Sequence, residues 1–352
     1  MGSYIVRRLA YMVSVLLVVS AITFFLMHAV PGGPFSSEKR LPQAQIEIIE
    51  EAYNLNDPLL VQYGNYLSDV FIPKINSEPP SDYSVKEDYL INIRFGSIWF
   101  KWMNFGPSYN SLSRSVTDLI EQQFPVSFQL GVLALLVALV IGIPLGIISA
   151  MRQNTIVDYI SMGVAIVGVS VPVIVLGPIM VRLFGVSLKW FPPSGWGARP
   201  PYFLGLFPRN IGWNFFKYAI MPAIALGTGS SAIIARLTRA SLLQVLHEDY
   251  IRTARAKGLK EKLVIGRHAL KNALIPVVTI FGPLFAAIVT GSFVTETIFA
   301  IPGLGEYFVA SIGNRDYPVI MGTILLYVLL LVFSNLFVDI TYAFLDPRIR
   351  LE

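Results

Sequence analysis

Long runs of apolar residues without Lys, Arg, Asp or Glu alternate with polar segments along the chain. There are six such runs, each of 18 to 24 residues. Because about 20 helical residues cross a hydrocarbon layer about 30 Å thick, each run is long enough to span a bilayer. The pattern predicts an all-α polytopic membrane protein with six transmembrane helices. The runs are Leu9–Val30, Ser127–Ala150, Tyr159–Val181, Tyr218–Ala235, Ala273–Val294 and Val319–Val338.

The charged residues between these runs predict the side of the membrane that each loop faces. Arg7 and Arg8 precede the first run, and nine basic residues against three acidic ones lie between the fourth and fifth runs. Short loops rich in Lys and Arg stay in the cytoplasm. We therefore expect both termini in the cytoplasm. Residues 1–30 form the N-terminal end and first helix, 31–125 a small extracytoplasmic lobe, and 126–352 a five-helix core with a cytoplasmic loop at 236–272.

The composition agrees with a membrane protein. Of 352 residues, 54% are hydrophobic and 14% charged, and the net charge is +5; soluble domains carry about 25% charged residues. The basic loops are explained by topology, so we expect contact with membrane lipid and none with nucleic acid. The chain has no cysteine and three scattered histidines, which form no local metal-binding motif.

Residues 31–125 are too long for a simple connection between two helices. Leu41–Tyr66 has helix-like apolar spacing, and Ile72–Glu87 is rich in Pro, Ser and acidic residues. Five aromatic residues then follow between Phe95 and Phe105. Aromatic rings favour the membrane interface, so we expect this lobe to lie against the outer membrane surface.

The segment Ser241–Pro276 shows helical periodicity on the cytoplasmic side. Leu243, Leu246, Tyr250 and Ala254 fall on one face of a helix, and Gly258 is placed to end it because glycine tolerates the left-handed conformation. A second short helix is expected to run from there to the membrane. On periodicity alone, an amphipathic basic loop of this kind is also typical of an anchor on the lipid surface.

The residues of this loop resemble those of a known family. Arg252–Gly258, with the sequence RTARAKG, and Asn272–Pro276 resemble the EAA loop of ABC importer membrane subunits, in the form typical of oligopeptide and dipeptide permeases. The match places Ala254 on the second alanine of the motif, Gly258 on its glycine and Pro276 on its final proline. Arg252 and Thr253 depart from the generic glutamate and first alanine.

The resemblance extends along most of the chain and is closest to the B-type permease of that family. Gly33 stands where the family usually has aspartate, and 71–104 resembles an insertion relative to shorter relatives. The further matching segments are Arg7–Arg8, His28–Pro34, Asn54–Leu59, Phe105–Tyr109, Phe124–Ser127, Pro302–Gly305 and Leu345–Arg348.

The resemblance implies a type I ABC importer permease fold in a prokaryotic inner membrane. It implies half of a translocation pathway for oligopeptides or dipeptides, built with a homologous C-type permease, two ABC ATPase subunits and an extracytoplasmic substrate-binding protein. The loop would couple to the ATPases, with Ala254 in a tight apolar contact. The ATPase-coupling loop residues are Asp249, Tyr250, Thr253, Ala254, Arg255, Gly258 and Pro276.

The sequence lacks the pattern needed to hydrolyse ATP. A phosphate-binding loop requires G-x-x-x-x-G-K-[ST] after a strand, and Gly258–Lys260 does not fit it. We therefore expect a transporter subunit that is not an enzyme and holds no cofactor, with ATP bound by partner subunits. Three alternatives remain: the same class of transporter moving nickel or another small solute, a secondary transporter driven by an ion gradient, and a membrane-bound enzyme or scaffold.

Overall fold

The computed structural model describes residues 2–35, 47, 50–51, 53–77, 88–111 and 113–345. Much of the N-terminal half of the helix expected over 41–66 lies outside the described residues. The same holds for 78–87 of the Pro- and Ser-rich stretch and for Arg348 and Arg350 near the C-terminus.

Four helices in the described part of the chain are long and apolar enough to cross a membrane. They are α1 (Gly2–Ala29), α4 (Val116–Met151), α7 (Trp213–Val245) and α14 (Tyr317–Leu345). Two bent pairs of helical segments raise the number of candidate spans to six if each pair is one span. The helical, polytopic architecture predicted from the apolar runs is confirmed.

We expected the third apolar run to form one continuous helix, and the structure shows that it does not. It consists of α5 (Ile156–Ser170) and α6 (Val173–Met180), followed by the π-helix η2 (Val181–Ser187). The two parts meet at an angle of 96°. Pro172 follows the break and disfavours helical geometry at Val171, which is extended with φ −96° and ψ 108°.

The second bent pair lies between the basic loop and the fifth apolar run. Its first part comprises α9 (Glu261–Leu263), the π-helix η3 (Val264–Ala269) and α10 (Leu270–Ala273), and its second part is α11 (Ile275–Val289). The bend is 49°. The helix of the fifth run ends at Val289, five residues before the expected end at Val294. Gly291 has φ +115°, and a separate helix α12 (Phe293–Phe299) follows.

The chain divides into two compact units, each made of segments far apart in sequence. Unit 1 contains Pro125–Gly303 together with the N-terminal end of α1 and the C-terminal end of α14, and unit 2 contains Tyr11–Phe124 and Leu304–Val328. This grouping differs from the division at residues 30 and 125 drawn from the apolar runs. The transmembrane helices α1, α4 and α14 each contribute to both units.

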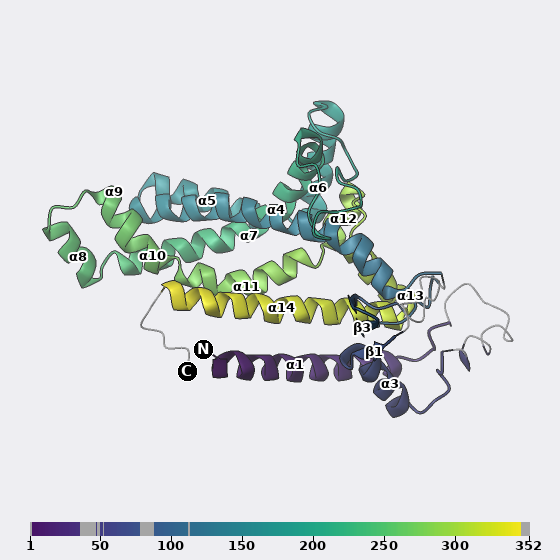
Figure 1. Cartoon of the computed structure of the whole chain (residues 1–352). Helices are drawn as coiled ribbons and strands as arrows, with labels where there is room; N and C mark the ends of the chain where they lie inside the picture. The colour runs from purple at the N-terminus through teal and green to yellow at the C-terminus, as the bar shows by residue number, and fades with distance from the viewer. Residues whose placement is uncertain are drawn as a thin grey trace. The chain divides into compact units, whose positions relative to one another are not determined.

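Within unit 1, helices α4, α5 and α7 run side by side (Figure 1). The contact between α4 and α7 is close because α4 carries glycines there. A Cβ atom at Gly142 would lie 2.6 Å from the carbonyl oxygen of Ser231, and one at Gly146 would lie 2.6 Å from that of Ala235. Small residues let two membrane helices approach to backbone contact, so these helices form a tightly packed core.

Unit 2 holds α3 (Leu59–Phe71), α13 (Leu304–Asn314) and a small antiparallel sheet that we had not expected. The strands β1 (Lys74–Asn76), β2 (Ile91–Phe95) and β3 (Ile98–Trp102) have the order β1-β3-β2. Phe95 pairs with Ile98 across a two-residue turn, where Gly96 has φ +64°. A glycine at a left-handed turn position is typical of a tight hairpin.

Candidate coupling segment

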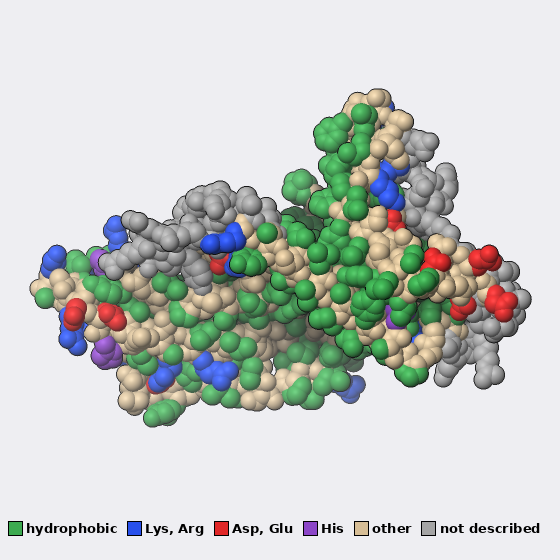
Figure 2. Space-filling view, turned by 90° about the horizontal axis from the view of Figure 1, so that it is seen from below, with side chains coloured by type: hydrophobic (Ala, Val, Ile, Leu, Met, Phe, Trp, Pro, Cys, Tyr) green, Lys and Arg blue, Asp and Glu red, His purple; other side chains and the backbone are tan. Residues whose placement is uncertain are grey.

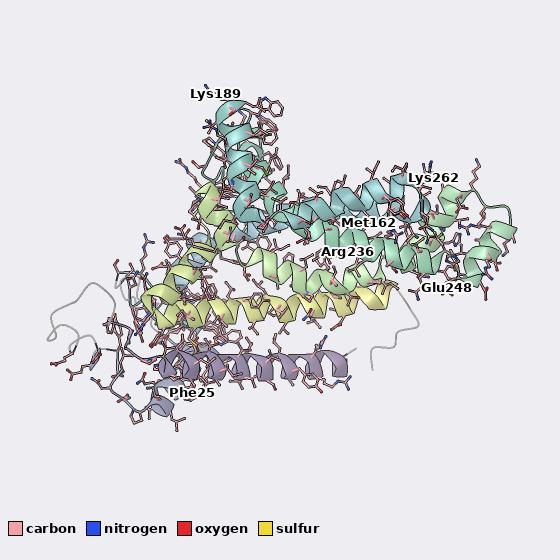
Figure 3. All side chains as sticks on the ribbon, turned by 180° about the vertical axis from the view of Figure 1, so that it is seen from behind. Phe25, Met162, Lys189, Arg236, Glu248 and Lys262 are labelled. Atoms are coloured by element: carbon pink, nitrogen blue, oxygen red, sulfur yellow. The ribbon has the colours of Figure 1, made fainter. Side chains whose placement is uncertain are left out.

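The expected helical face over 241–257 is broken by a turn, because three residues separate the end of α7 at Val245 from the start of α8 (Asp249–Ala256). Glu248 is extended, with φ −69° and ψ 147°. Leu243 and Leu246 therefore do not share a helix with Tyr250 and Ala254, contrary to our expectation. Glu248 and Lys262 both lie at the end of unit 1 that carries α8 and α9 (Figure 3).

The inward face of α8 packs against its own chain. Ile251 is completely buried and Ala254 is only 6% exposed. Both belong to a cluster that draws on the ends of several helices, and burying this apolar surface fixes α8 to the membrane helices. The structure thus places Ala254 inside the segment rather than on its outer surface. The other buried members of the cluster are Ala150, Leu242, Val264, Ala269 and Ala273.

The outward face of α8 is polar and exposed. Asp249, Arg252 and Thr253 are all exposed, and Tyr250 is 41% exposed. The Thr253 hydroxyl donates to the Asp249 carbonyl oxygen at 2.9 Å. The Asn272 side chain donates to the Tyr250 hydroxyl at 2.8 Å, which ties α8 to α10. This face is therefore held in a fixed position while its side chains are accessible.

The turn after α8 is a glycine-terminated helix end, as predicted from Lys257–Leu259. Gly258 has φ +74°; its N–H donates to the Arg255 carbonyl at 2.9 Å and that of Leu259 to the Ala254 carbonyl at 3.4 Å. This pair of bonds is the Schellman arrangement, which requires a left-handed residue. The helix end is thus specified by local sequence.

An ion pair closes the same turn. The Arg255 guanidinium donates to both oxygens of Glu261, at 3.2 and 2.6 Å, and these hydrogen bonds raise the pKa of Arg255. The pair is largely solvent-exposed, so its contribution to stability is small. It does, however, fix the direction in which the chain leaves α8 towards α9.

Pro276 is the second residue of α11. Proline is well tolerated in the first helical turn, because its missing N–H would have no partner there. It lies just after the bend between α10 and α11 and marks the start of the apolar part of the span, as predicted. The seven expected loop residues therefore lie on one connected segment, although Ala254 faces inward and Pro276 lies at its far end.

Charged side chains gather at the end of unit 1 formed by α8 and α9, as the space-filling view shows (Figure 2). Residues 236–271 contain nine basic and three acidic residues. Lys257, Lys260 and Lys262 are all exposed. This end therefore offers a positive surface next to the polar face of α8.

An ion pair with a buried carboxylate, beside this segment, was missed at the level of sequence. Asp158 in α5 is 2% exposed and receives two hydrogen bonds from Arg239 of α7, at 2.9 and 2.8 Å. The sequence offered a charged residue in each of two loops, but their separation of 81 positions gave no signal that they meet. Glu296, in the first turn of α12, is likewise fully buried and accepts a 2.7 Å hydrogen bond from the Ser127 hydroxyl.

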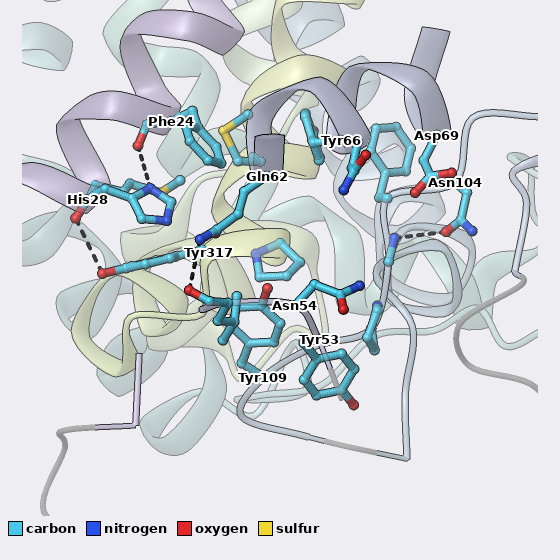
Figure 4. A pocket seen from close by; sticks show the side chains of 18 residues that line it. Phe24, His28, Tyr53, Asn54, Gln62, Tyr66, Asp69, Asn104, Tyr109 and Tyr317 are labelled. Atoms are coloured by element: carbon cyan, nitrogen blue, oxygen red, sulfur yellow. Dashed lines mark hydrogen bonds between the residues drawn. The ribbon is translucent and has the colours of Figure 1, made fainter. Parts of the chain in front are cut away.

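Unit 2 contains a cavity of about 200 Å³. Aromatic and amide side chains line it, including His28, Gln62 and Tyr109 (Figure 4). The His28 ring bonds the Phe24 carbonyl through Nδ1 at 2.8 Å. Burial raises the pKa of Tyr109. In the part of the chain that the structure describes, no group of three or more His, Cys, Asp or Glu side chains is arranged to hold a metal ion.

Comparison with known families gives two matches. Residues 142–351 match the model of the binding-protein-dependent transport system inner membrane component. Residues 1–81 match the model of the N-terminal part of a binding-protein-dependent transport system membrane component.

Curated proteins similar to this chain match it over nearly its whole length. It is 41% identical to the dipeptide transport system permease protein DppB of Bacillus subtilis, covering 100% of this chain and 99% of that protein. It is 38% identical to the oligopeptide transport system permease protein OppB of Salmonella typhimurium, covering 99% and 100%. Among solved structures, an inward-facing MetNI methionine ABC transporter matches 65% of this chain and 96% of its own, with 18% identity and a TM-score of 0.49.

Proposed function

Because this chain belongs to the family of binding-protein-dependent transport system inner membrane components, we propose that it is a permease subunit of an ATP-driven importer of dipeptides or oligopeptides. The observation that carries this proposal is the similarity, at 37 to 41% identity, to permeases named for dipeptide or oligopeptide transport. That similarity covers at least 99% of this chain in the relatives compared above.

The chain is a multi-pass inner membrane protein, and we propose its orientation from charge. The basic end of unit 1, with α8 and α9, faces the cytoplasm, because short basic loops are retained there. Both termini then lie in the cytoplasm, and the α3 and β-sheet region of unit 2 lies outside. We call α6 and η2 (173–187) the α6 arm. Lys189 lies at its tip, and within unit 1 it is distant from Lys262 (Figure 3).

The proposed assembly contains this B-type subunit, a homologous C-type permease, two ABC ATPases and an extracytoplasmic substrate-binding protein. ATP is bound by the ATPases, and this chain acts as neither an enzyme nor a cofactor-binding protein. The exposed polar face of α8, with Asp249, Tyr250 and Thr253, is the part that an ATPase contacts. Its fixed position supports this role, because a flexible linker would absorb a displacement instead of transmitting it.

The inward face of α8 determines how movement of an ATPase reaches the membrane helices. Ile251 and Ala254 belong to one buried apolar cluster with Leu242 of α7 and Ala150 of α4. Close-packed interiors transmit strain because they contain few voids. A displacement of α8 therefore carries the cytoplasmic ends of α4 and α7 with it, and opening or closing of the pathway follows movement of the ATPases.

The proposal is tested by uptake in cells that lack only this subunit. Deletion should abolish uptake of labelled dipeptide or oligopeptide, and the intact chain supplied in trans should restore it. Uptake of labelled Ni²⁺ serves as the parallel measurement for the alternative substrate. Loss of Ni²⁺ uptake with normal peptide uptake would contradict peptide import, as would restored uptake in cells from which the ATPases had also been deleted.

A further inference from the structure

The carboxylate of Asp158 joins three parts of unit 1 at a single buried point. It lies in the first turn of α5 and accepts hydrogen bonds from Arg239 of α7 through both guanidinium nitrogens, Nε and Nη2, at 2.9 and 2.8 Å. The hydroxyl of Ser149 at the end of α4 donates to it. The backbone N–H of Asn154, in the turn between α4 and α5, donates at 3.0 Å.

Further along the two helices, α5 and α7 meet through small side chains. Ala165 of α5 packs with Ala232 and Ala235 of α7. A Cβ atom at Gly168 would lie 3.4 Å from Cβ of Thr228. Apolar contact between smooth helix surfaces is non-directional, so it holds the two helices together without fixing their position along the axis. A bidentate hydrogen bond between Arg and a carboxylate is directional, so it does fix the position of the two helices along their axes.

Arg239 lies on the helix that leads into the coupling segment, residues 249–276. Arg239 lies three residues before Leu242, which belongs to the same buried cluster as Ile251 and Ala254 of α8. At its other end α5 meets α6 at the 96° break. Asp158 and Arg239 therefore connect the helix that carries α8 to the helix that carries the α6 arm.

We propose that Asp158 and Arg239 are positioning residues that lock the axial register of α5 against α7, so that α5 and its α6 arm follow the coupling segment when the ATPases close. The inference rests on the proposed function and names residues that act through helix position rather than through contact with substrate or ATP. Without the lock, α7 slides along α5, and ATP is hydrolysed with less peptide imported per ATP.

The test uses the whole complex reconstituted in lipid vesicles, with peptide uptake and ATP hydrolysis measured together. Arg239→Lys keeps the charge but loses the two-pronged geometry, and Asp158→Asn loses the ion pair but keeps a polar side chain. Both should copurify normally with the ATPases, while the ratio of peptide imported to ATP hydrolysed falls by about five-fold. A purely structural role would lower the yield of complex and leave that ratio unchanged.

A second Arg and Asp pair in unit 1 provides the matched control. Arg8 of α1 donates to Asp339 of α14 through Nε at 2.9 Å, and the pair involves neither α5 nor α7. Arg8→Lys should leave the ratio of peptide to ATP unchanged. An equal fall in Arg8→Lys and Arg239→Lys would overturn the register lock, because the effect would then follow any lost ion pair.

A covalent lock should rescue the defect. The natural chain has no cysteine, and the closeness of Gly168 and Thr228 suits a disulfide, whose Cβ atoms lie about 3.8 Å apart. Gly168→Cys with Thr228→Cys, oxidised in the Arg239→Lys background, should restore the ratio, and reduction should remove the rescue. An unchanged ratio in Arg239→Lys, loss of assembly in both single variants, or no rescue after complete oxidation would each overturn the proposal. If the unmodified complex imports no peptide, the proposed function itself fails.

Discussion

At the scale of single residues, Ala254 and Gly258 show how one motif serves two physical purposes. Ala254 is small because it lies on the inward face of α8, within the buried cluster that includes Leu242. Gly258 is a glycine because its φ is +74°, and open space surrounds the position where a Cβ would lie. A substitution at Gly258 therefore meets backbone strain alone, whereas a larger residue at Ala254 disturbs packing within the chain itself.

Gly258→Val should weaken the helix end and the coupling of ATP hydrolysis to uptake. A left-handed conformation costs a residue with a Cβ about 1 to 2 kcal/mol, and β-branching adds to that cost. Gly258→Asn is the matched control, because asparagine tolerates this conformation. We expect near-normal uptake with Asn and a clear loss with Val, measured at equal amounts of protein in the membrane. Equal uptake by the two variants would show that the turn geometry is unimportant.

At the scale of elements, the sequence predicted the membrane spans and the glycine-terminated helix end. It did not predict the helix break or the contacts that depend on distant residues. The spans and the helix end at Gly258 follow from about 20-residue apolar stretches and from glycine chemistry. Pro172 was visible, yet a membrane helix often continues through a proline with the help of its neighbours, so the 96° break was not predicted. The hairpin around Gly96 had a signal in Ile91–Phe95 and Ile98–Trp102, but the aromatic cluster was interpreted as an interface anchor.

The coupling segment, too, was predicted only in its local features. The sequence placed seven residues on one basic segment, and the structure connects them. The periodicity put Ala254 on one face with Tyr250, whereas Ala254 shares the inward face with Ile251, because the turn at Leu246–Glu248 changes the helical phase between α7 and α8. The sequence also did not pair Asp158 with Arg239, because a contact across 81 positions depends on the packing of two helices.

The outward face of α8 provides the test that separates docking on an ATPase from anchoring on lipid. Thr253→Arg places a long side chain on the exposed face without touching Ile251 or Ala254. If this face docks on an ATPase, copurification of the ATPase should fall by about tenfold, which corresponds to about 1.4 kcal/mol. The thermal stability of the purified chain should not change, because Thr253 is exposed.

Neutral replacement of Lys260 and Lys262 serves as the comparison, because both lie near α8 but outside it. A lipid anchor depends on total basic charge, with about 1 kcal/mol for each Lys near an anionic surface. That alternative predicts a larger effect for the two lysines than for Thr253→Arg, measured by vesicle binding and by ATPase copurification. The docking proposal predicts the reverse order.

At the scale of the whole molecule, each compact unit is assembled from segments that the chain brings together over long distances. In unit 2, the carboxylate of Asp316 accepts the backbone N–H groups of Tyr109 and Asn110 at 3.0 and 3.1 Å. The segment after Gly106 is thereby tied to the start of α14. Domain boundaries drawn from apolar runs alone divide such a unit, because a run marks a span and carries no information about its partners.

The chain segment that carries the β-sheet of unit 2 begins and ends at neighbouring positions. The N–H of Asn104 donates to the carbonyl of Asp69 at 3.0 Å, so the two ends of the intervening segment are neighbours. The sheet exposes apolar side chains, with Ile75 67% and Phe95 65% exposed. Exposed apolar surface beside polar residues is typical of a site for a protein partner, and we propose that the extracytoplasmic substrate-binding protein docks here.

Replacing residues 73–102 by a short Gly and Ser linker should therefore leave membrane insertion and ATPase copurification intact, because the ends already meet. Docking of the substrate-binding protein should weaken, and uptake at low peptide concentration should fall. Phe95→Ser is the milder companion variant: it removes exposed apolar area at the sheet edge and should weaken docking by about 1 to 3 kcal/mol. Docking is measured by binding of labelled substrate-binding protein to vesicles that contain the complex. Normal docking and uptake in both variants would mean that the sheet has no part in transport, since the chain would then import peptide equally well without it.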